Sequence, residues 1–309
     1  MLTDIQRLQM LQTPAGPIDM VLDTDAYNEI DDQYAISYAM FAERLNLKAL
    51  YAAPFQNGHA ATPAIGMQRS YEEILNLLQL MGREAAVYAG STAFLPDEQT
   101  PVVSPAAEDL VRRAMDYTWD KPLYVVAIGA ITNVASALLM KPEIAERIVI
   151  VWLGGHGPEW HDNAEFNCRQ DVASARVVYD SGAPLVILPC MGVVSAFTTT
   201  SPELEYWLRG KSALCDYLIT HTENTANAYA AGKVWSRPLW DVTAIGWLLN
   251  DENRFMLDKL VPTPIPEYDH HYAADPRRPL CRMVYHINRD ALLGDLFAHL
   301  TKGADHADK

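Results

Sequence analysis

Acidic side chains crowd one short stretch near the start of the chain. Asp23, Asp25, Glu29, Asp31 and Asp32 fall within ten residues. Like charges at this spacing repel one another and raise one another's pKa values unless a cation or a helix N-terminus compensates them. Hard divalent cations such as Ca²⁺ and Mg²⁺ prefer carboxylate oxygens as ligands. The cluster therefore favours a metal site over a solvated acidic turn.

An EF-hand does not explain this cluster. With Asp23 and Asp25 as the first two ligands of such a loop, Asn28 would stand at the glycine position. Tyr34 would then stand where the loop requires a bidentate glutamate. The cluster calls for another kind of metal site.

The net charge of the whole chain limits its partners. The 309 residues contain 24 Lys and Arg against 39 Asp and Glu, which gives a formal net charge of −15. Nucleic acids and anionic membranes both require clustered basic side chains, so neither is expected as a partner. Much of the negative charge lies between Arg7 and Arg44, an interval without Lys or Arg. Its acidic residues are Asp19, Asp23, Asp25, Glu29, Asp31, Asp32 and Glu43.

Short, continuous apolar runs alternate with helical patterns along most of the chain. Such runs are typical of parallel strands that are buried on both faces of a sheet. The predicted strands are Ile18–Leu22, Leu47–Ala53, Leu123–Ile128, Ile148–Leu153 and Leu185–Leu188. The predicted helices between them are Asp32–Arg44, Pro63–Met81, Pro105–Tyr117, Asn133–Met140 and Val172–Ser181. This order predicts an α/β fold with an open, mostly parallel sheet flanked by helices.

The last third of the chain has a different pattern. Helices are predicted over 202–209, 212–230, 241–249 and Asp290–Leu300, with loops and short strands over Val261–Ile287 and a polar tail over Thr301–Lys309. No linker rich in Gly, Ser or Pro divides the sequence. We therefore expect one domain over residues 1–309, with a helical C-terminal portion.

Several polar residues follow the predicted strands, where α/β proteins bind their ligands. Asn57 follows the second strand, and Thr132-Asn133 follows the third. Gly154-Gly155 follows the fourth, in a loop that reaches Glu165 and Asn167. Each has a simple explanation as a turn or a cap, but their shared position predicts one site at that edge of the sheet.

Several common enzyme motifs are missing from the sequence, and its composition is typical of an intracellular protein. The chain has no G-x-S-x-G, Walker A, G-x-G-x-x-G or H-E-x-x-H motif. Residues 1–16 contain no continuous apolar region of a signal peptide, and the longest apolar runs are too short to span a bilayer. Widely spaced cysteines fit reduced thiols, so we expect a cytoplasmic protein. They are Cys168, Cys190, Cys215 and Cys281.

The ordered set of motifs resembles the nucleoside hydrolases of the inosine–uridine preferring type. The resemblance covers residues 18 to about 250, and every segment lies in the same order as in that family. The segments are Asp23-Thr24-Asp25, Asp31-Asp32, Gly129-Ala130-Ile131-Thr132-Asn133, Leu153-Gly154-Gly155, Ala164-Glu165-Phe166-Asn167 and Trp240-Asp241.

This resemblance implies a site with one Ca²⁺ ion and a ribonucleoside. It implies that Asp25, Asp32 and Asp241 bind the ion through their carboxylates and Ile128 through its carbonyl. It also implies that Asp25 takes a proton from the attacking water. The ribose hydroxyls would be held by Asp31, Asn57, Glu165, Asn167 and Asp241. The implied reaction is hydrolysis of the N-glycosidic bond to free base and ribose, in purine salvage, by a homodimer or homotetramer.

The sequence departs from the family pattern at three places. The turn between Asp25 and Asp31 is two residues longer than the common D-x-D-P-G-x-D-D form and lacks Pro-Gly. The loop between Gly155 and Glu165 is shortened, which leaves Trp160, His161 and Asn163 as candidates to contact the 5′-hydroxyl. Trp240 stands where the less selective branch has a histidine. A tryptophan there resembles the purine-selective branch and implies a preference for purine ribonucleosides.

Two other functions fit parts of the sequence. A haloacid-dehalogenase-type Mg²⁺ phosphohydrolase also has Asp-x-Asp after its first strand, with Asp23 as the nucleophile here. That class requires a Lys and a later acidic pair, and Asp31-Asp32 come too early. A Ca²⁺-dependent nucleoside- or ribose-binding protein without turnover is the other alternative.

Overall fold

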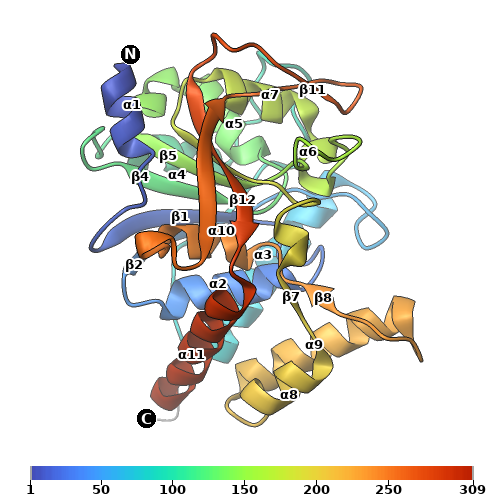
Figure 1. Ribbon diagram of the computed structural model, residues 1–309. Helices are drawn as coiled ribbons and strands as arrows, with labels where there is room; N and C mark the ends of the chain where they lie inside the picture. The colour runs from blue at the N-terminus through green and yellow to red at the C-terminus, as the bar shows by residue number, and fades with distance from the viewer. Residues whose placement is uncertain (1, 308–309) are drawn as a thin grey trace.

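A computed structural model describes residues 2–307, with side chains for residues 2–303 (Figure 1). Its centre is an eight-stranded sheet in the order β3-β2-β1-β4-β5-β6-β12-β9. All neighbouring strands in it are parallel except β12 and β9, which are antiparallel. The strands are β1 (Ile18–Thr24), β2 (Leu45–Ala52), β3 (Val87–Ala89), β4 (Leu123–Ala127), β5 (Ile148–Leu153), β6 (Leu185–Leu188), β9 (Met256–Pro262) and β12 (Leu280–Ile287). The predicted open, mostly parallel α/β sheet is confirmed.

Helices cover both faces of this sheet (Figure 1). The α-helices before β6 are α1 (Asp4–Met10), α2 (Asp31–Phe41), α3 (Pro63–Met81), α4 (Pro105–Ala114), α5 (Thr132–Met140), α6 (Phe166–Gln170) and α7 (Val172–Asp180). Those after it are α8 (Ser201–Leu208), α9 (Ala213–Ala230), α10 (Val242–Leu248) and α11 (Arg289–Ala307). One apolar core includes buried residues of α2, α3 and α8 to α11, and a second includes those of α4, α5 and α7.

Short elements complete the fold. The 3-10 helices are η1 (Pro142–Glu146), η2 (Val194–Ala196) and η3 (Asp251–Asn253). Two small antiparallel pairs join β7 (Thr198–Thr199) to β8 (Arg237–Pro238) and β10 (Ile265–Pro266) to β11 (Tyr272–Ala273). No helix in the part of the chain that the structure describes is long and apolar enough to cross a membrane.

All five predicted strands form, and they lie side by side as β2-β1-β4-β5-β6. They were predictable because the residues of β4, β5 and β6 are buried without interruption. The prediction of loops and short strands over Val261–Ile287 was wrong for β12, an eight-residue strand of the central sheet. Exposed Tyr285 and His286 interrupt its apolar pattern because β12 lies next to the edge of the sheet.

The two ends of the chain also differ from expectation. A capping box between Thr3 and Gln6 starts helix α1, which was not predicted. Helix α11 continues through Thr301 to Ala307, so the predicted polar tail is helical there, and residues 308–309 lie outside the described part. Gly303 lets α11 pack closely against Phe41 at the end of α2, because a β-carbon on Gly303 would lie 2.5 Å from the Phe41 ring. The prediction of one domain over residues 1–309 stays a prediction.

Candidate active site

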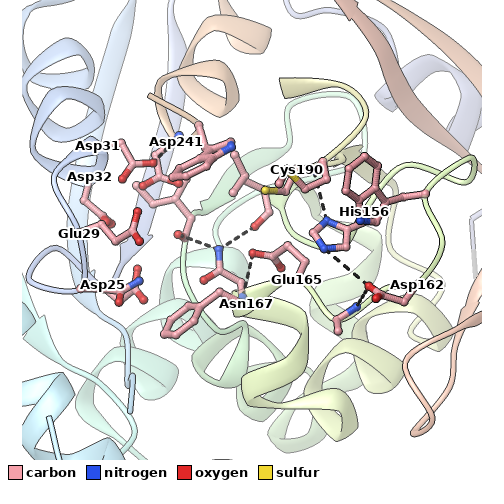
Figure 2. A pocket seen from close by; sticks show the side chains of 18 of the residues that line it. Asp25, Glu29, Asp31, Asp32, His156, Asp162, Glu165, Asn167, Cys190 and Asp241 are labelled. Atoms are coloured by element: carbon pink, nitrogen blue, oxygen red, sulfur yellow. Dashed lines mark hydrogen bonds and ion pairs between the residues drawn. The ribbon is translucent and has the colours of Figure 1, made fainter. Parts of the chain in front are cut away.

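The parallel strands end together at one edge of the sheet and open into a cavity of about 340 Å³ (Figure 2). Residues that follow β1, β4, β5 and β6 line it, together with Trp240 and Asp241. Every predicted site residue except Asn57 lies in this lining: Asp25, Asp31, Asp32, Ile128, Glu165, Asn167, Trp240 and Asp241. The shared position of these residues at strand ends was therefore a useful signal.

Three buried carboxylates form the acidic end of the cavity (Figure 2). One oxygen each of Asp31, Asp32 and Asp241 lies within 4.8 Å of the other two. Helix α2 begins at Asp31 and α10 begins directly after Asp241, so both helix starts face this end. Thr24 at the end of β1 donates a hydrogen bond to Asp32 at 2.5 Å, which fixes that carboxylate.

Asp25 lies at the same end but outside this close group of three. A β-carbon on Gly129 would lie 3.1 Å from the Asp25 carboxyl group, so the missing side chain makes room for it. Only about 1% of Asp25 is exposed, and its Oδ2 has no hydrogen-bond partner among the described residues. A buried polar atom without a partner costs free energy, which indicates that a ligand belongs here.

Burial and mutual repulsion make these carboxylates unusually weak acids. Burial raises the pKa of Asp25 well above its ordinary value, and the charges of Asp32 and Asp31 raise it further. Burial and Asp31 likewise raise the pKa of Asp32 to about 8. A bound divalent cation would reverse these shifts because it favours the charged carboxylates. Buried oxygen donors with one unpartnered atom fit a hard cation such as Ca²⁺ or Mg²⁺.

Arg237 is the buried cation at this end, and sequence reasoning missed it. Its guanidinium donates a hydrogen bond to Glu29 and lies 3.9 Å from the Asp31 carboxylate. It also lies 5.0 Å from the centre of the Trp240 ring. Glu29 and Arg237 are 208 residues apart in sequence. The only signal for this contact was that a buried acidic cluster needs a positive partner.

Glu165 and Asn167 lie in the middle of the cavity (Figure 2). Glu165 caps helix α6 and accepts hydrogen bonds from the backbone N–H groups of Asn167, Cys168 and Gly155 at 2.8–3.0 Å. Burial nevertheless raises its pKa to about 7. The Asn167 side-chain amide donates to the carbonyls of Ile128 and Leu153, each at 3.1 Å. Asn167 therefore joins the ends of β4 and β5, and Glu165 joins the start of α6 to the loop after β5.

The structure does not bring Asn57 into the cavity. Its side-chain amide donates to Oδ1 of Asn28 at 2.7 Å, and Asn28 lines the cavity. Its Oδ1 accepts the backbone N–H of His59, which closes a tight turn. Asn28 belongs to the lengthened turn after Asp25, so this turn separates Asn57 from the other predicted residues.

The end opposite the acidic group contains a histidine that sequence reasoning missed. Nδ1 of His156 accepts the backbone N–H of Met191 at 3.2 Å, so in the neutral ring Nε2 carries the proton. Burial lowers the pKa of His156, which favours this neutral form. Its Nε2 lies 3.9 Å from the Asp162 carboxylate, beyond hydrogen-bond distance. This end of the cavity thus presents a neutral N–H donor.

The three candidates for contact with a 5′-hydroxyl divide into two groups. Trp160 and His161 line the cavity, whereas Asn163 does not. Asn163 accepts the backbone N–H of His156 at 2.8 Å and donates to the sulfur of Cys168 at 3.4 Å. Asn163 therefore stabilises the loop that contains His156 and does not form part of the cavity lining.

Asp23 lies apart from the cavity. It is fully buried, and its Oδ1 accepts a hydrogen bond from the Asn133 side chain at 2.7 Å. A phosphohydrolase nucleophile must reach its substrate, and Asp23 does not line the cavity. This position disfavours the haloacid-dehalogenase alternative.

Comparisons with known proteins agree with the fold and the motifs. The family model of the inosine-uridine preferring nucleoside hydrolases matches residues 20–291. The non-specific ribonucleoside hydrolase RihC of Salmonella schwarzengrund is 27% identical over 262 residues, which cover 77% of this chain and 80% of that protein.

Solved structures share the same fold at low sequence identity. A purine-preferring ribonucleoside hydrolase from Gardnerella vaginalis has a TM-score of 0.74 at 20% identity, over 93% of this chain and 99% of that one. An inosine-uridine preferring nucleoside hydrolase from Bacillus anthracis has a TM-score of 0.65 at 16% identity, over 92% and 99%. The chain therefore belongs to the inosine-uridine preferring nucleoside hydrolase family and is a hydrolase of N-glycosyl compounds.

Proposed function

We propose that this protein hydrolyses ribonucleosides to free base and ribose in a Ca²⁺-dependent reaction, with a preference for purine nucleosides. The observation that carries the proposal is the buried group of Asp31, Asp32 and Asp241 beside the unpartnered carboxylate oxygen of Asp25. An uncharged substrate with vicinal hydroxyls suits such a cavity, because carboxylates accept hydrogen bonds from hydroxyls. A phosphorylated substrate would be repelled by the same charges.

The cation site combines side-chain and backbone oxygens. We assign Asp25, Asp32 and Asp241 as carboxylate ligands and Ile128 as the carbonyl ligand, with Asp31 close enough to share the ion. When bound, Ca²⁺ would hold the ribose diol in place and lower the pKa of a water molecule. Asn167 supports this arrangement because it fixes the Ile128 carbonyl.

Asp25 is the proposed base. It takes a proton from the attacking water, whose oxygen forms a bond to C1′ while the bond from C1′ to the base nitrogen breaks. The electron pair of the broken bond leaves with the nucleobase, which then takes up a proton from solvent. The ribosyl group passes through an oxocarbenium-like transition state, and the surrounding carboxylates stabilise its positive charge.

The ribose hydroxyls are assigned to Asp31, Glu165, Asn167 and Asp241. Glu165 is held by backbone N–H groups and Asn167 by the carbonyls at the ends of β4 and β5, so little side-chain freedom is lost when substrate binds. Asn57 would act through Asn28, whose side chain lines the cavity. We further expect a cytoplasmic homo-oligomer, a dimer or a tetramer, that serves purine salvage.

Trp240 supports the purine preference. It lines the cavity beside Asp241, where its ring can stack on a nucleobase. A purine offers a larger ring system than a pyrimidine, and stacking also helps a purine leaving group to accept a proton from solvent. Faster hydrolysis of uridine than of inosine and adenosine would contradict this preference.

A panel of nucleosides tests the proposal. Release of reducing sugar from inosine, adenosine, guanosine and uridine is measured with Ca²⁺ and with a chelator. The proposal predicts ribose release from purine nucleosides with Ca²⁺ and its loss with the chelator. Nucleoside binding without release would instead identify a non-catalytic binding protein, and activity unchanged by the chelator would exclude the metal.

A further inference from the structure

The buried guanidinium of Arg237 has carboxylates on one side and an aromatic ring on the other. Arg237 is about 6% exposed, pairs with Glu29 and lies 3.9 Å from Asp31. Its backbone is held in the short β7–β8 pair, where Thr199 lies opposite it. Its position is therefore fixed from both the backbone and the side chain.

The same guanidinium lies over the Trp240 ring. Its central carbon is 5.0 Å from the ring centre, within the range of a cation–π interaction. Trp240 lines the cavity, but Arg237 is not among the described residues that do so. One side of the indole thus contacts the guanidinium, while the residue still offers surface to a ligand in the cavity.

Glu29, which anchors Arg237, comes from the turn that is two residues longer than the common family form. Its side chain is 42% exposed, whereas that of Arg237 is 7% exposed. Glu29 and Trp240 both line the cavity, so the ion pair connects two parts of its lining through the buried Arg237. The lengthened turn is thereby connected, through Glu29 and Arg237, to Trp240, which is proposed to contact the base.

We propose that Arg237 is a positioning residue for base selection, which acts on the nucleobase through Trp240 and is held in place by Glu29. This inference rests on the proposed function. A ring that is fixed before binding loses less conformational freedom when the base stacks on it. A purine has the larger ring system and therefore covers more of a fixed indole than a pyrimidine does. Inosine gains more from this support than uridine does.

The alternative role of Arg237 is a simple counter-charge for Asp31. Lysine distinguishes the two roles because it keeps the positive charge but lacks the planar group that stacks on a ring. Arg237→Lys and Arg237→Met are therefore compared with wild type for kcat/KM on inosine and uridine. Inhibition by free ribose reports the acidic end alone, since ribose has no base.

The matched control is Arg254→Lys. Arg254 lies 4.1 Å from the centre of the Phe255 ring, and neither residue lines the cavity. This substitution changes the same kind of contact elsewhere in the protein. It should leave the ratio of kcat/KM for inosine over uridine unchanged.

The proposal predicts that both Arg237 variants lose about tenfold in that ratio. Inhibition by ribose should change by less than about twofold in Arg237→Lys, because lysine keeps the positive charge beside Asp31. Glu29→Gln should give a smaller loss, since the amide still accepts a hydrogen bond from Arg237. This milder variant tests the proposal even if the Arg237 variants fold poorly.

Two results would overturn the proposal. A wild-type ratio in Arg237→Lys would mean that charge alone suffices, and equal losses for inosine, uridine and ribose would mean a general effect on the acidic end. If the wild-type protein hydrolyses neither nucleoside, the proposed function fails separately. In that case, calorimetry measures the affinities of wild type and the Arg237 variants for inosine, uridine and ribose. The ratio of the affinities for inosine and uridine then replaces the ratio of kcat/KM values.

Discussion

The side-chain amide of Asn167 donates a hydrogen bond to the carbonyl of Ile128 at 3.1 Å. The same nitrogen donates to the Leu153 carbonyl, so one side chain joins the ends of two neighbouring strands. A carbonyl oxygen has two lone pairs, and this bond leaves one of them available. Asn167 thus both faces the cavity and orients the carbonyl that we assign to the cation.

Asn167→Ala should weaken Ca²⁺ binding although Asn167 is not assigned as a ligand. Removing the amide frees the Ile128 carbonyl to turn and leaves two buried acceptors without this donor. Residues that orient metal ligands typically account for about 10–100-fold in affinity. The Ca²⁺ midpoint, measured as the rise in thermal unfolding temperature with Ca²⁺ concentration, should increase by that factor.

Asn46→Ala is the control for this substitution, because Asn46 is exposed at the start of β2 and its side chain donates to Asp19 on the neighbouring strand β1, away from the cavity lining. Its Ca²⁺ midpoint should equal that of wild type. If Asn167→Ala also leaves the midpoint unchanged, the Ile128 carbonyl is not a ligand in the way proposed here.

Gly66 tests the packing that supports the loop after β2. A β-carbon on Gly66 in helix α3 would lie 1.9 Å from the carbonyl oxygen of Phe55, which is rigid backbone. Gly66→Ala should therefore lower the free energy of unfolding by about 1–3 kcal/mol. Denaturation in urea measures this change.

Gly294→Ala is the matched control within another helix. Among the described residues, no atom outside the nearby turns of its own helix lies within 4 Å of the position that its β-carbon would take, and alanine is the better helix former. This variant should raise the free energy of unfolding by about 0.5–1 kcal/mol. A stabilising Gly66→Ala would show that α3 does not pack against Phe55 as described.

A histidine–aspartate pair on helix α11 makes stability depend on pH. The hydrogen bond with Asp295 raises the pKa of His299 above 6.5, against the opposing effect of burial. Because the pKa is raised on folding, the pair adds to the free energy of unfolding. This stabilisation is fully present below pH 6.5 and is lost as pH rises through the pKa of His299 in the folded state. His299→Gln should lack it, so wild type should lose roughly 0.5–1 kcal/mol more than the variant between pH 6 and pH 8.

Urea denaturation of both proteins in saturating Ca²⁺ measures this difference, since other titrating groups then contribute equally to the two. An identical pH dependence for wild type and His299→Gln would mean that the pair does not stabilise the folded state. At low pH the stabilisation by this pair is also lost, because Asp295 becomes protonated as pH falls through its lowered pKa.

The sequence allowed prediction of those parts of the fold and site that depend on local pattern. Strands β4, β5 and β6 are continuous apolar runs because both faces of the sheet are covered. Asp25, Asp31 and Asp32 follow β1 directly, so their shared location could be inferred from one segment. Asp241 was connected to them only through the family resemblance.

The residues that escaped prediction act through contacts between distant segments. Arg237 meets Glu29 across 208 residues, and the role of His156 depends on the backbone N–H of Met191. Neither contact leaves a periodic pattern in the sequence. Asn57 was expected in the cavity, but the lengthened turn brings Asn28 between it and the other side chains.

The most direct test of the account is Asp25→Asn with inosine in saturating Ca²⁺. Wild type should release hypoxanthine and ribose, whereas the variant should be slower by about 10²–10⁴-fold because the amide cannot take the proton from water. Its fold should persist, since a neutral side chain relieves repulsion from Asp31 and Asp32. A folded variant with the wild-type rate would contradict the central claim.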